Sequence, residues 1–321
     1  MKTSFNQLPK SRFGVAGYSL VEMMVSITIG LVIVAALIGV LTSNSRSSKT
    51  NDRTAELQSN GRYALDHLRR ELRHAGYRGY TWAEPNTPTI TGITNECLDG
   101  GAANSFVVNL RQGIWGADNN PYSANCLSGA TAATIRLRGD ILVIRRLASA
   151  PTATADLTAN TLYFRSAYAA GQVFQGTVEP SIPGTPVNNF ALQEYVYYIG
   201  SDDNDTTVPA LRRVALSSNG AMADEMVVSG IEHMQVQYGR TTSDLNTRYY
   251  DANAMTGKST DSAQTEWDDI NSVRIWLLAR NAKPETGYSN TSSYAMGSVT
   301  YGPVSDNFRR QLFTAVVQLR N

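Results

Sequence analysis

The sequence is poor in several features that mark common functional classes. Two cysteines in 321 residues are too few for a disulfide-built mini-scaffold or a four-thiolate zinc site. The 28 Lys and Arg residues nearly balance the 27 Asp and Glu residues, which argues against a nucleic acid held by bulk charge. The 25 glycines and 11 prolines are ordinary numbers that exclude collagen-like and proline-linker chains.

Catalytic motifs are also missing from the sequence. It contains no Gly-x-Ser-x-Gly elbow, no phosphate-binding glycine loop and no His-Glu-x-x-His pair. His233 is a lone histidine in an expected strand, a position that is more often structural than catalytic. The sequence therefore predicts a protein that is not an enzyme and that needs no cofactor and no metal.

Charge is absent from one long apolar run, Met23–Ser45. A helix of about 20 residues is about 30 Å long, which is enough to cross the hydrocarbon core of a bilayer. The leader before this run carries Lys2, Lys10 and Arg12 and no acidic residue. Such positive charge keeps the amino terminus in the cytoplasm, so the sequence predicts one membrane-spanning helix followed by an exported body.

A cleaved secretory signal is the alternative interpretation of this run. It fits poorly, because a secretory signal has an apolar stretch of about 7–15 residues followed by a small-residue cleavage site. Here the apolar run is longer and continues into a helical pattern. Glu22, at the edge of the run, is either a headgroup-zone carboxylate or a costly buried charge that needs a partner.

The segment Gly17-Tyr18-Ser19-Leu20-Val21-Glu22 closely resembles the type IV prepilin signal. The resemblance implies that prepilin peptidase cleaves after Gly17 and that the new amino terminus at Tyr18 is N-methylated. It also implies that Glu22 meets the Tyr18 ammonium of a neighbouring subunit during filament assembly. Pairing agrees with the physics, since two charges that are each costly in apolar surroundings become tolerable together.

The helical pattern continues beyond the apolar run to Ala75. Spacings of mainly three and four define one apolar face, made of Leu57, Ala64, Leu65, Leu68, Leu72 and Ala75. Gly76 supplies a left-handed stop, so one helix is expected over 18–75. His67 and His74 lie on this helix without further ligands nearby, and are interpreted as solvated or rim residues rather than a metal site.

Short strands between polar loops are expected after residue 76. The candidates are Ser105–Arg111, Thr134–Arg138, Asp140–Leu147, Thr161–Arg165, Glu194–Ile199, Leu211–Leu216, Ile231–Tyr238, Ser272–Ala279 and Leu312–Leu319. Long loops are expected at 81–104, 112–132, 166–193 and 240–267. The expected fold class is α+β, pilin-like, with a long N-terminal helix whose apolar half protrudes and whose second half packs on an antiparallel β-rich body.

Two further patterns in the body have competing interpretations. Cys97 and Cys126 are expected to form one disulfide in an oxidising periplasm, the alternative being two free buried thiols. The Asp202–Asp205 segment resembles a calcium loop, but Thr207 and Arg213 stand where an EF-hand needs glycine and glutamate. A solvated turn is the better interpretation, and weak calcium binding outside the EF-hand plan is left open.

Several later stretches resemble PilW-family minor pilins. They are Gly61–Leu65, Glu71–Tyr77, Gly230–Gly239, Trp267–Arg280, Arg309–Phe313 and Leu319–Asn321. The implied organisation is a leader at 1–17, a transmembrane and assembly half-helix at 18–45, an amphipathic half-helix at 46–76 and a periplasmic body at 77–321. Removing the leader leaves 304 residues (321 − 17), a length that favours a minor subunit over a major one.

The resemblance implies that the protein helps to prime type IV pilus assembly and forms part of the tip complex, in twitching motility, adhesion and DNA uptake. The implied partners are other minor pilins, the major pilin, a PilY-type tip adhesin, prepilin peptidase and the inner-membrane assembly platform. The protein would lie in the inner membrane before assembly and in the pilus fibre or tip afterwards. The alternatives are a J-type minor pseudopilin of a type II secretion system and a membrane-anchored binding or adhesin domain that never polymerises.

Overall fold

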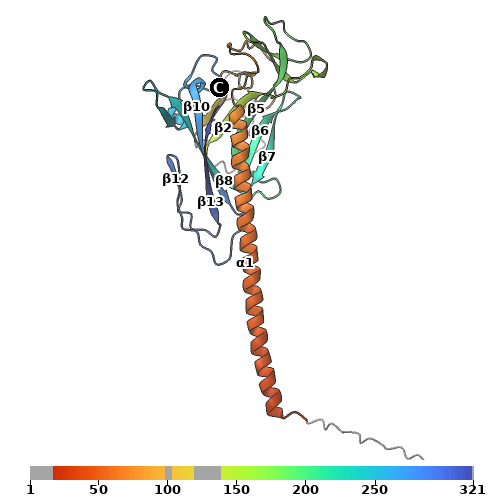
Figure 1. The fold of residues 1–321 in the computed structure, drawn as a ribbon, viewed down its shortest axis with the longest axis vertical. Helices are drawn as coiled ribbons and strands as arrows, with labels where there is room; N and C mark the ends of the chain where they lie inside the picture. The colour runs from red at the N-terminus through yellow and green to blue at the C-terminus, as the bar shows by residue number, and fades with distance from the viewer. Residues whose placement is uncertain (1–16, 98–102, 119–138, 320–321) are drawn as a thin grey trace, which may run out of the picture. The chain divides into compact units, whose positions relative to one another are not determined.

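The computed structural model of the protein describes residues 17–97, 103–118 and 139–319. The chain divides into two compact units, Met1–Asp52 and Arg53–Asn321. One continuous helix, α1 (Leu20–His74), contributes to both units (Figure 1). The expected helix over 18–75 is confirmed, starting two residues later and ending one residue earlier.

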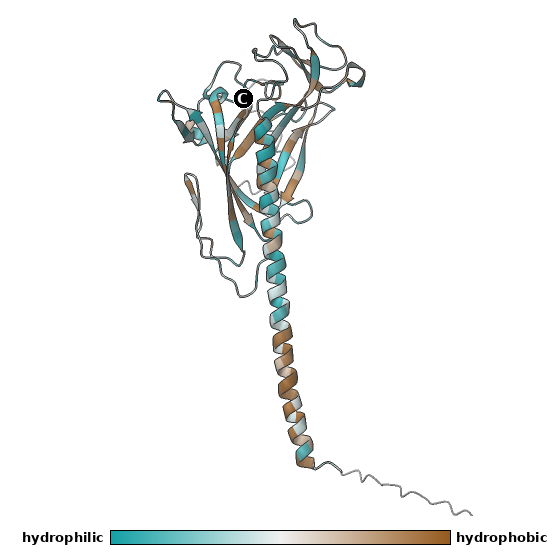
Figure 2. Cartoon of the chain, viewed as in Figure 1, coloured by the Kyte–Doolittle hydropathy of each residue, from teal (hydrophilic) through white to brown (hydrophobic). Residues whose placement is uncertain are grey.

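The described part of the first unit consists of residues 17–19 and of α1 as far as Asp52, and it includes the apolar run. Most of the apolar run has the hydrophobic colour in the cartoon of Figure 2, and its large apolar side chains are exposed. This helix is the one described element that is long and apolar enough to cross a membrane. A helix that is apolar all round, with nothing of its own chain covering it, requires another apolar environment.

The second unit buries one stripe of α1. The buried helix residues are Leu57, Gly61, Ala64, Leu65, Leu68 and Leu72, and Ala75 follows them into the core. The apolar face expected from the sequence is confirmed, with Gly61 as an addition. Gly76 has φ +75°, the left-handed conformation expected for a glycine that ends a helix.

A seven-stranded sheet forms the larger part of the body. Its strands are β1 (Ile114–Ala117), β2 (Ile141–Leu147), β3 (Leu162–Ser166), β4 (Gly171–Gln175), β5 (Asn188–Ser201), β6 (Pro209–Leu216) and β7 (Met222–Ser229). The order is β1-β2-β5-β3-β4, and β6 pairs with both β5 and β7. β5 is long enough, at 14 residues, to pair with β2, β3 and β6.

A four-stranded sheet and a short hairpin complete the body. The sheet has the order β13-β10-β8-β9 and contains β8 (Ile231–Thr241), β9 (Thr247–Tyr250), β10 (Ile270–Arg280) and β13 (Arg310–Gln318). The hairpin pairs β11 (Tyr294–Met296) with β12 (Val299–Tyr301). The described residues also form the short 3-10 helices η2 (Thr154–Asp156), η3 (Ala252–Ala254) and η4 (Glu266–Asp269). The paired strands are antiparallel, so the α+β fold class is confirmed.

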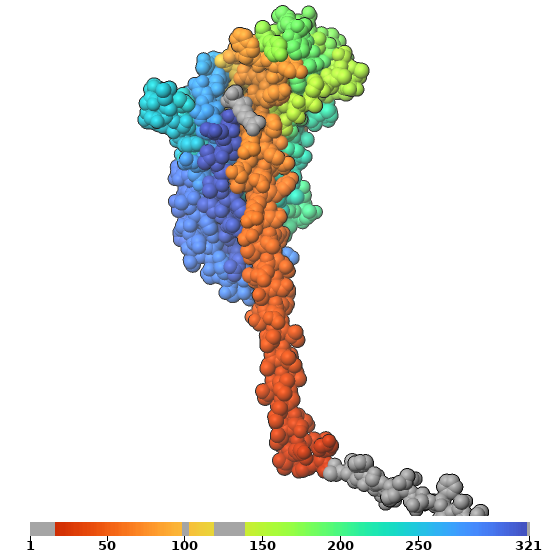
Figure 3. Space-filling model, in the orientation of Figure 1, coloured from red at the N-terminus to blue at the C-terminus, as the bar shows by residue number. Residues whose placement is uncertain are grey.

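One hydrophobic core joins α1 to both large sheets. Leu68 and Leu72 of α1 lie in the same buried cluster as Val196 of β5 and Ile275 of β10. Figure 3 shows α1 side by side with the C-terminal strand β13 on the surface of the body. The second half of the helix is therefore a core element of the body.

Several of the strands and loops predicted from the sequence were wrong. Ser105–Arg111 is irregular, because the Glu96 carboxylate accepts hydrogen bonds from the backbone N–H groups of Phe106 and Val107 at 2.8 and 3.0 Å. These N–H groups are then not free for a strand ladder. The expected loops at 166–193 and 240–267 contain β4 and β9, while the candidate Thr134–Arg138 lies outside the described residues.

Gly61 brings α1 against the C-terminal strand. A Cβ at this position would overlap the ring of Phe313 on β13. An exposed helical Gly→Ala change normally stabilises by roughly 0.5–1 kcal/mol. Gly61→Ala is instead expected to lower the free energy of unfolding by about 1–3 kcal/mol, because it overpacks this contact. Chemical denaturation of the variant measures this, with Ser59→Ala on the exposed face of the helix as the control; stabilisation by Gly61→Ala would contradict the packing.

Candidate functional site

The predicted cleavage position lies in a non-helical, exposed segment directly before α1. Gly17 has nothing within 4 Å of a Cβ position, and Tyr18 is 84% exposed. The first helical hydrogen bond joins the Met23 N–H to the Ser19 carbonyl at 3.0 Å. The peptide bond after Gly17 is therefore free of the helical ladder, and extended backbone is what a peptidase requires. Cleavage there and methylation of Tyr18 remain predictions.

Glu22 lies in the first turn of α1. A carboxylate there interacts favourably with the positive end of the helix dipole. Its backbone carbonyl accepts a hydrogen bond from Ser26 Oγ at 2.8 Å. Its proposed pairing with a neighbouring Tyr18 is a contact between chains, and it stays a prediction.

Three hydroxyl groups of the apolar run, those of Ser26, Thr28 and Thr42, form hydrogen bonds inside the helix. Thr28 Oγ1 donates to the Val25 carbonyl at 2.9 Å, and Thr42 Oγ1 donates to the Ile38 carbonyl at 2.9 Å. Polar groups bonded within their own helix can enter hydrocarbon without a partner. Glu22 is the single residue of a charged type in the segment Leu20–Ser45.

The structure describes one of the two cysteines that are predicted to form a disulfide. Cys97 is fully buried, as either a bridged cysteine or a buried thiol would be, and Cys126 lies outside the described residues. The pairing of Cys97 with Cys126 therefore stays a prediction.

The two helix histidines have separate structural surroundings. His67 Nε2 shares a hydrogen bond with Tyr197 Oη at 2.9 Å, and burial, aided by Arg213, lowers the pKa of His67. His74 is exposed, and its Nδ1 lies 2.9 Å from the Arg70 carbonyl. Within the described ranges, no three His, Cys, Asp or Glu side chains gather as metal ligands.

The Asp-rich segment after β5 is a turn between strands, as expected. Asp202 and Asp205 accept hydrogen bonds from the backbone of Asn204 and Thr207 at 2.8 and 3.0 Å. Asp203 is bound to Arg212 at 2.6 Å. Asp202 and Asp205 are therefore engaged by the backbone of the turn, and Asp203 by an arginine of β6.

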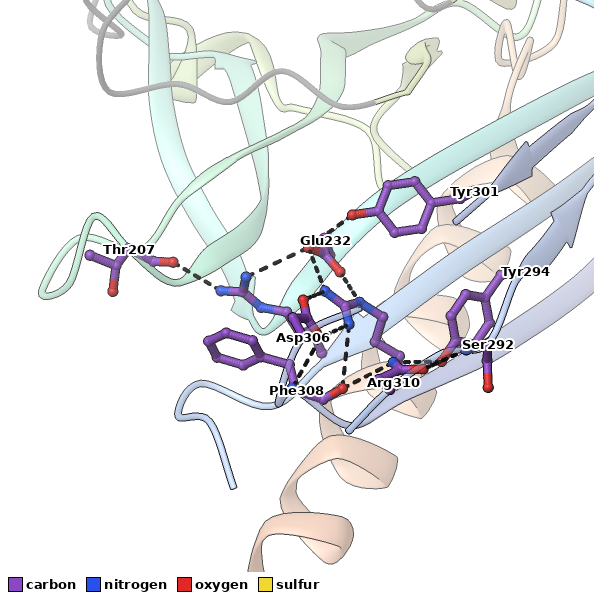
Figure 4. A network of polar contacts seen from close by, with 10 residues as sticks. Thr207, Glu232, Ser292, Tyr294, Tyr301, Asp306, Phe308 and Arg310 are labelled. Carbon is purple, nitrogen blue, oxygen red and sulfur yellow. Dashed lines mark hydrogen bonds and ion pairs between the residues drawn. The ribbon is translucent and has the colours of Figure 1, made fainter. Parts of the chain in front are cut away.

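A buried charge network lies where β8, β10 and the segment before β13 meet (Figure 4). Arg310 Nε contacts Glu232 at 2.5 Å, and Arg310 Nη2 contacts Asp306 at 2.6 Å. Arg280 lies 3.6 Å from Glu232 and donates to the Thr207 carbonyl at 2.9 Å. Hydrogen bonds from Arg310 hold the pKa of Asp306 below its usual range. The positive charges of two guanidinium groups thus equal the negative charges of two carboxylates within one cluster.

A buried arginine–glutamate pair lies in the larger sheet. Arg145 on β2 and Glu194 on β5 are cross-strand neighbours whose side chains are each 1% exposed, with Nε and Oε1 at 2.9 Å. Arg145 also donates to the carbonyls of Phe106 and Gln112 at 3.0 and 3.2 Å. Glu194 Oε2 has no hydrogen-bond partner among the described residues. Burial raises the pKa of Glu194 to about 8, against the opposing effect of Arg145.

Sequence reasoning missed both charge clusters. The stretches around Glu232, Arg280 and Arg310 stood out in the sequence, but the pattern gave no sign that these three side chains meet. The usable signal was a charged residue inside an otherwise apolar strand, as at Glu232 and Arg145, because such residues are seldom buried without a partner.

Comparison with known proteins identifies two regions of the chain. The family model described as type IV pilus-assembly protein W, PilW, matches residues 196–321. The model of the prokaryotic N-terminal methylation motif matches residues 12–38. No curated protein matches the chain. Among solved structures, a type IV-like pilin, TTHA1219 from Thermus thermophilus, aligns over 83% of this chain and 96% of its own, with 14% identity and a TM-score of 0.36.

Proposed function

From the membership of this chain in the PilW family of type IV pilus minor pilins, we propose that it helps to prime pilus assembly and takes a place in the tip complex. One observation supports this proposal most directly. A methylation motif at 12–38 and a PilW region at 196–321 occur on the same chain, and α1 runs without a break from the first toward the body that contains the second.

The proposed course begins in the inner membrane. The apolar part of α1 would anchor the subunit there, and prepilin peptidase would cleave after Gly17 and methylate Tyr18. The exposed, non-helical segment around Gly17 and Tyr18 supports access by the peptidase. Extraction from the bilayer then requires other pilin helices to replace the lipid around the exposed apolar side chains.

Glu22 has a distinct role in this proposal. A carboxylate inside a bundle of apolar helices is costly unless a cation pairs with it. The ammonium group that cleavage creates at Tyr18 of a neighbouring subunit is such a cation. Other minor pilins, the major pilin, the assembly platform and a PilY-type tip adhesin would be its partners, and the β body would present the contacts at the tip. The role is structural, and no residue is assigned to catalysis.

Glu22→Gln tests the assembly role in the host that makes the pilus. We expect processing to continue, with intact mass showing loss of residues 1–17 and one added methyl group. We expect the number of surface filaments to fall by about tenfold or more, since the unpaired Tyr18 ammonium disfavours incorporation. Counts of filaments in sheared fractions measure this.

Glu56→Gln, at an exposed carboxylate of α1 beyond the apolar run, is the matched control and should leave filament number unchanged. Normal piliation with Glu22→Gln would refute the role of that residue. An uncleaved chain would refute the prepilin proposal. Deletion of the gene should abolish twitching; loss of enzyme secretion with intact twitching would instead indicate a type II secretion pseudopilin.

A further inference from the structure

A pocket of about 380 Å³ lies beside the C-terminal end of α1. Its wall combines two tryptophans, Trp82 and Trp267, with three charged residues, Arg78, Arg111 and Asp268. All of these lie in the second unit, and none belongs to the processing or assembly segment described above. Pockets of this size that combine apolar surface with a few converging polar groups are typical small-ligand sites.

The two tryptophans play different parts in the pocket. Trp267 is buried, its ring packs edge-on against Tyr238 at 4.8 Å, and its Nε1 donates to the Gly257 carbonyl at 3.1 Å. Trp267 is therefore a fixed part of the wall. Trp82, by contrast, is 82% exposed. An exposed indole at the rim of a pocket offers a flat apolar face on which a ligand can stack.

The charged residues of the pocket have hydrogen-bonding groups without partners among the described residues. Arg111 connects Glu84 at 2.8 Å with Asp268 Oδ2 at 3.3 Å. Asp268 Oδ1 is buried and has no hydrogen-bond partner among the described residues. The Arg78 guanidinium is half-buried, donates to the Arg111 carbonyl at 3.0 Å and forms no ion pair within the described part of the chain. A buried acceptor without a hydrogen bond is costly unless a ligand satisfies it. The Arg78 guanidinium, whose charge Glu84 and Asp268 stabilise from beyond ion-pair distance, keeps N–H donors available for an anion.

These groups together specify the chemistry of a ligand. Arg78 requires an anionic acceptor, Asp268 Oδ1 requires a hydrogen-bond donor such as a hydroxyl, and Trp82 requires a flat apolar face. An inorganic anion would satisfy only the arginine, and an apolar ligand would leave both charges unsatisfied. A sugar acid carries a carboxylate, several hydroxyls and a C–H face on one ring. We propose that this pocket binds an acidic pyranose through Arg78, Asp268 and Trp82.

A neighbouring pocket extends the proposed site. Arg111 also lines a pocket of about 350 Å³ together with Glu84, Ser105, Thr260 and Ser262. Hydroxyl and carboxylate groups of this kind hydrogen-bond the hydroxyls of a sugar. An acidic oligosaccharide is therefore expected to bind more tightly than its monomer.

The test is a titration of the full chain in detergent micelles with three probes: glucuronate, glucose and acetate. Tryptophan fluorescence and saturation-transfer NMR report binding. We expect saturable binding of glucuronate, with glucose and acetate each weaker by about tenfold, because glucose lacks the charge and acetate lacks the ring. Arg78→Gln should weaken glucuronate binding by about tenfold, and Trp82→Ala should abolish the fluorescence change. Thermal melting checks that both variants fold.

Arg73→Gln is the matched control, since Arg73 is exposed on α1 and does not line this pocket; it should leave binding unchanged. The proposal is refuted by an absence of saturable glucuronate binding up to roughly 50 mM, by acetate binding as tightly as glucuronate, or by an Arg78→Gln variant that binds like the parent. These outcomes are independent of piliation, so they leave the proposed role in assembly untouched.

Discussion

Replacement of Arg310 by methionine is expected to lower the free energy of unfolding of the body by about 3–5 kcal/mol, because it leaves buried Glu232 without its closest cation. The Arg310 side chain is 1% exposed and that of Glu232 is 3% exposed. Water therefore cannot replace the missing charge. Arg280, at 3.6 Å from Glu232, compensates only in part. Urea denaturation of the parent and the variant measures the difference.

A surface ion pair provides the control for Arg310→Met. Arg248 and Asp244 lie 3.1 Å apart with largely exposed side chains, and Arg248→Met should cost less than about 1 kcal/mol. The double variant Arg310→Met/Glu232→Gln should be more stable than the sum of its single changes predicts, since both act on one network. Equal costs for Arg310→Met and Arg248→Met would show that the network does not stabilise the body.

Stability is also expected to fall between pH 6 and pH 8 because of Glu194. Burial raises the pKa of Glu194 to about 8, whereas an unfolded glutamate has a pKa near 4.3. The folded state therefore binds the Glu194 proton more tightly than the unfolded state does. Its contribution to stability is complete below the unfolded pKa and is lost as the pH rises through 8. One proton gives a slope of about 1.4 kcal/mol per pH unit, or roughly 2–3 kcal/mol between pH 6 and pH 8.

Glu194→Gln isolates this contribution. The variant carries no titrating proton at position 194, so the difference between parent and variant should shrink or reverse as the pH rises from 6 to 8. His67, whose pKa is lowered by burial, titrates in both proteins and cancels in the comparison. A pH-independent difference in the free energy of unfolding would show that Glu194 stays ionised throughout this range, as a permanent partner of Arg145.

The helix could be predicted from the sequence because its signals are local. The spacing of Leu57, Leu65, Leu68 and Leu72 is a property of one continuous segment, and so is the glycine stop at Gly76. The buried role of Gly61 was not visible in this pattern. A glycine carries no apolar signal, and its importance comes from Phe313, more than 250 residues further along the chain.

The body was harder to predict because its decisive contacts are long-range. The strand β7 was missed because Asp224 and Glu225 face solvent and break the apolar alternation that marks a strand. The segment Ser105–Arg111 was misread because its consecutive apolar residues are buried by irregular backbone that the Glu96 carboxylate holds. Neither the charge network around Arg310 nor the pocket beside Trp82 follows from spacing, since each gathers residues from distant segments.

The position of β13 has a consequence for the order of folding. The core packs Leu57, Leu65 and Leu68 of α1 together with Ala315 and Val317 of β13. The strand β13, which shares this core with α1, is thus synthesised after almost all of the rest of the body. Contacts of such sequence separation slow folding, and a chain that lacks its late strand exposes apolar surface and a bare sheet edge. We therefore expect the body to close only after residues 310–318 have been synthesised, and β10 to remain an exposed sheet edge until then.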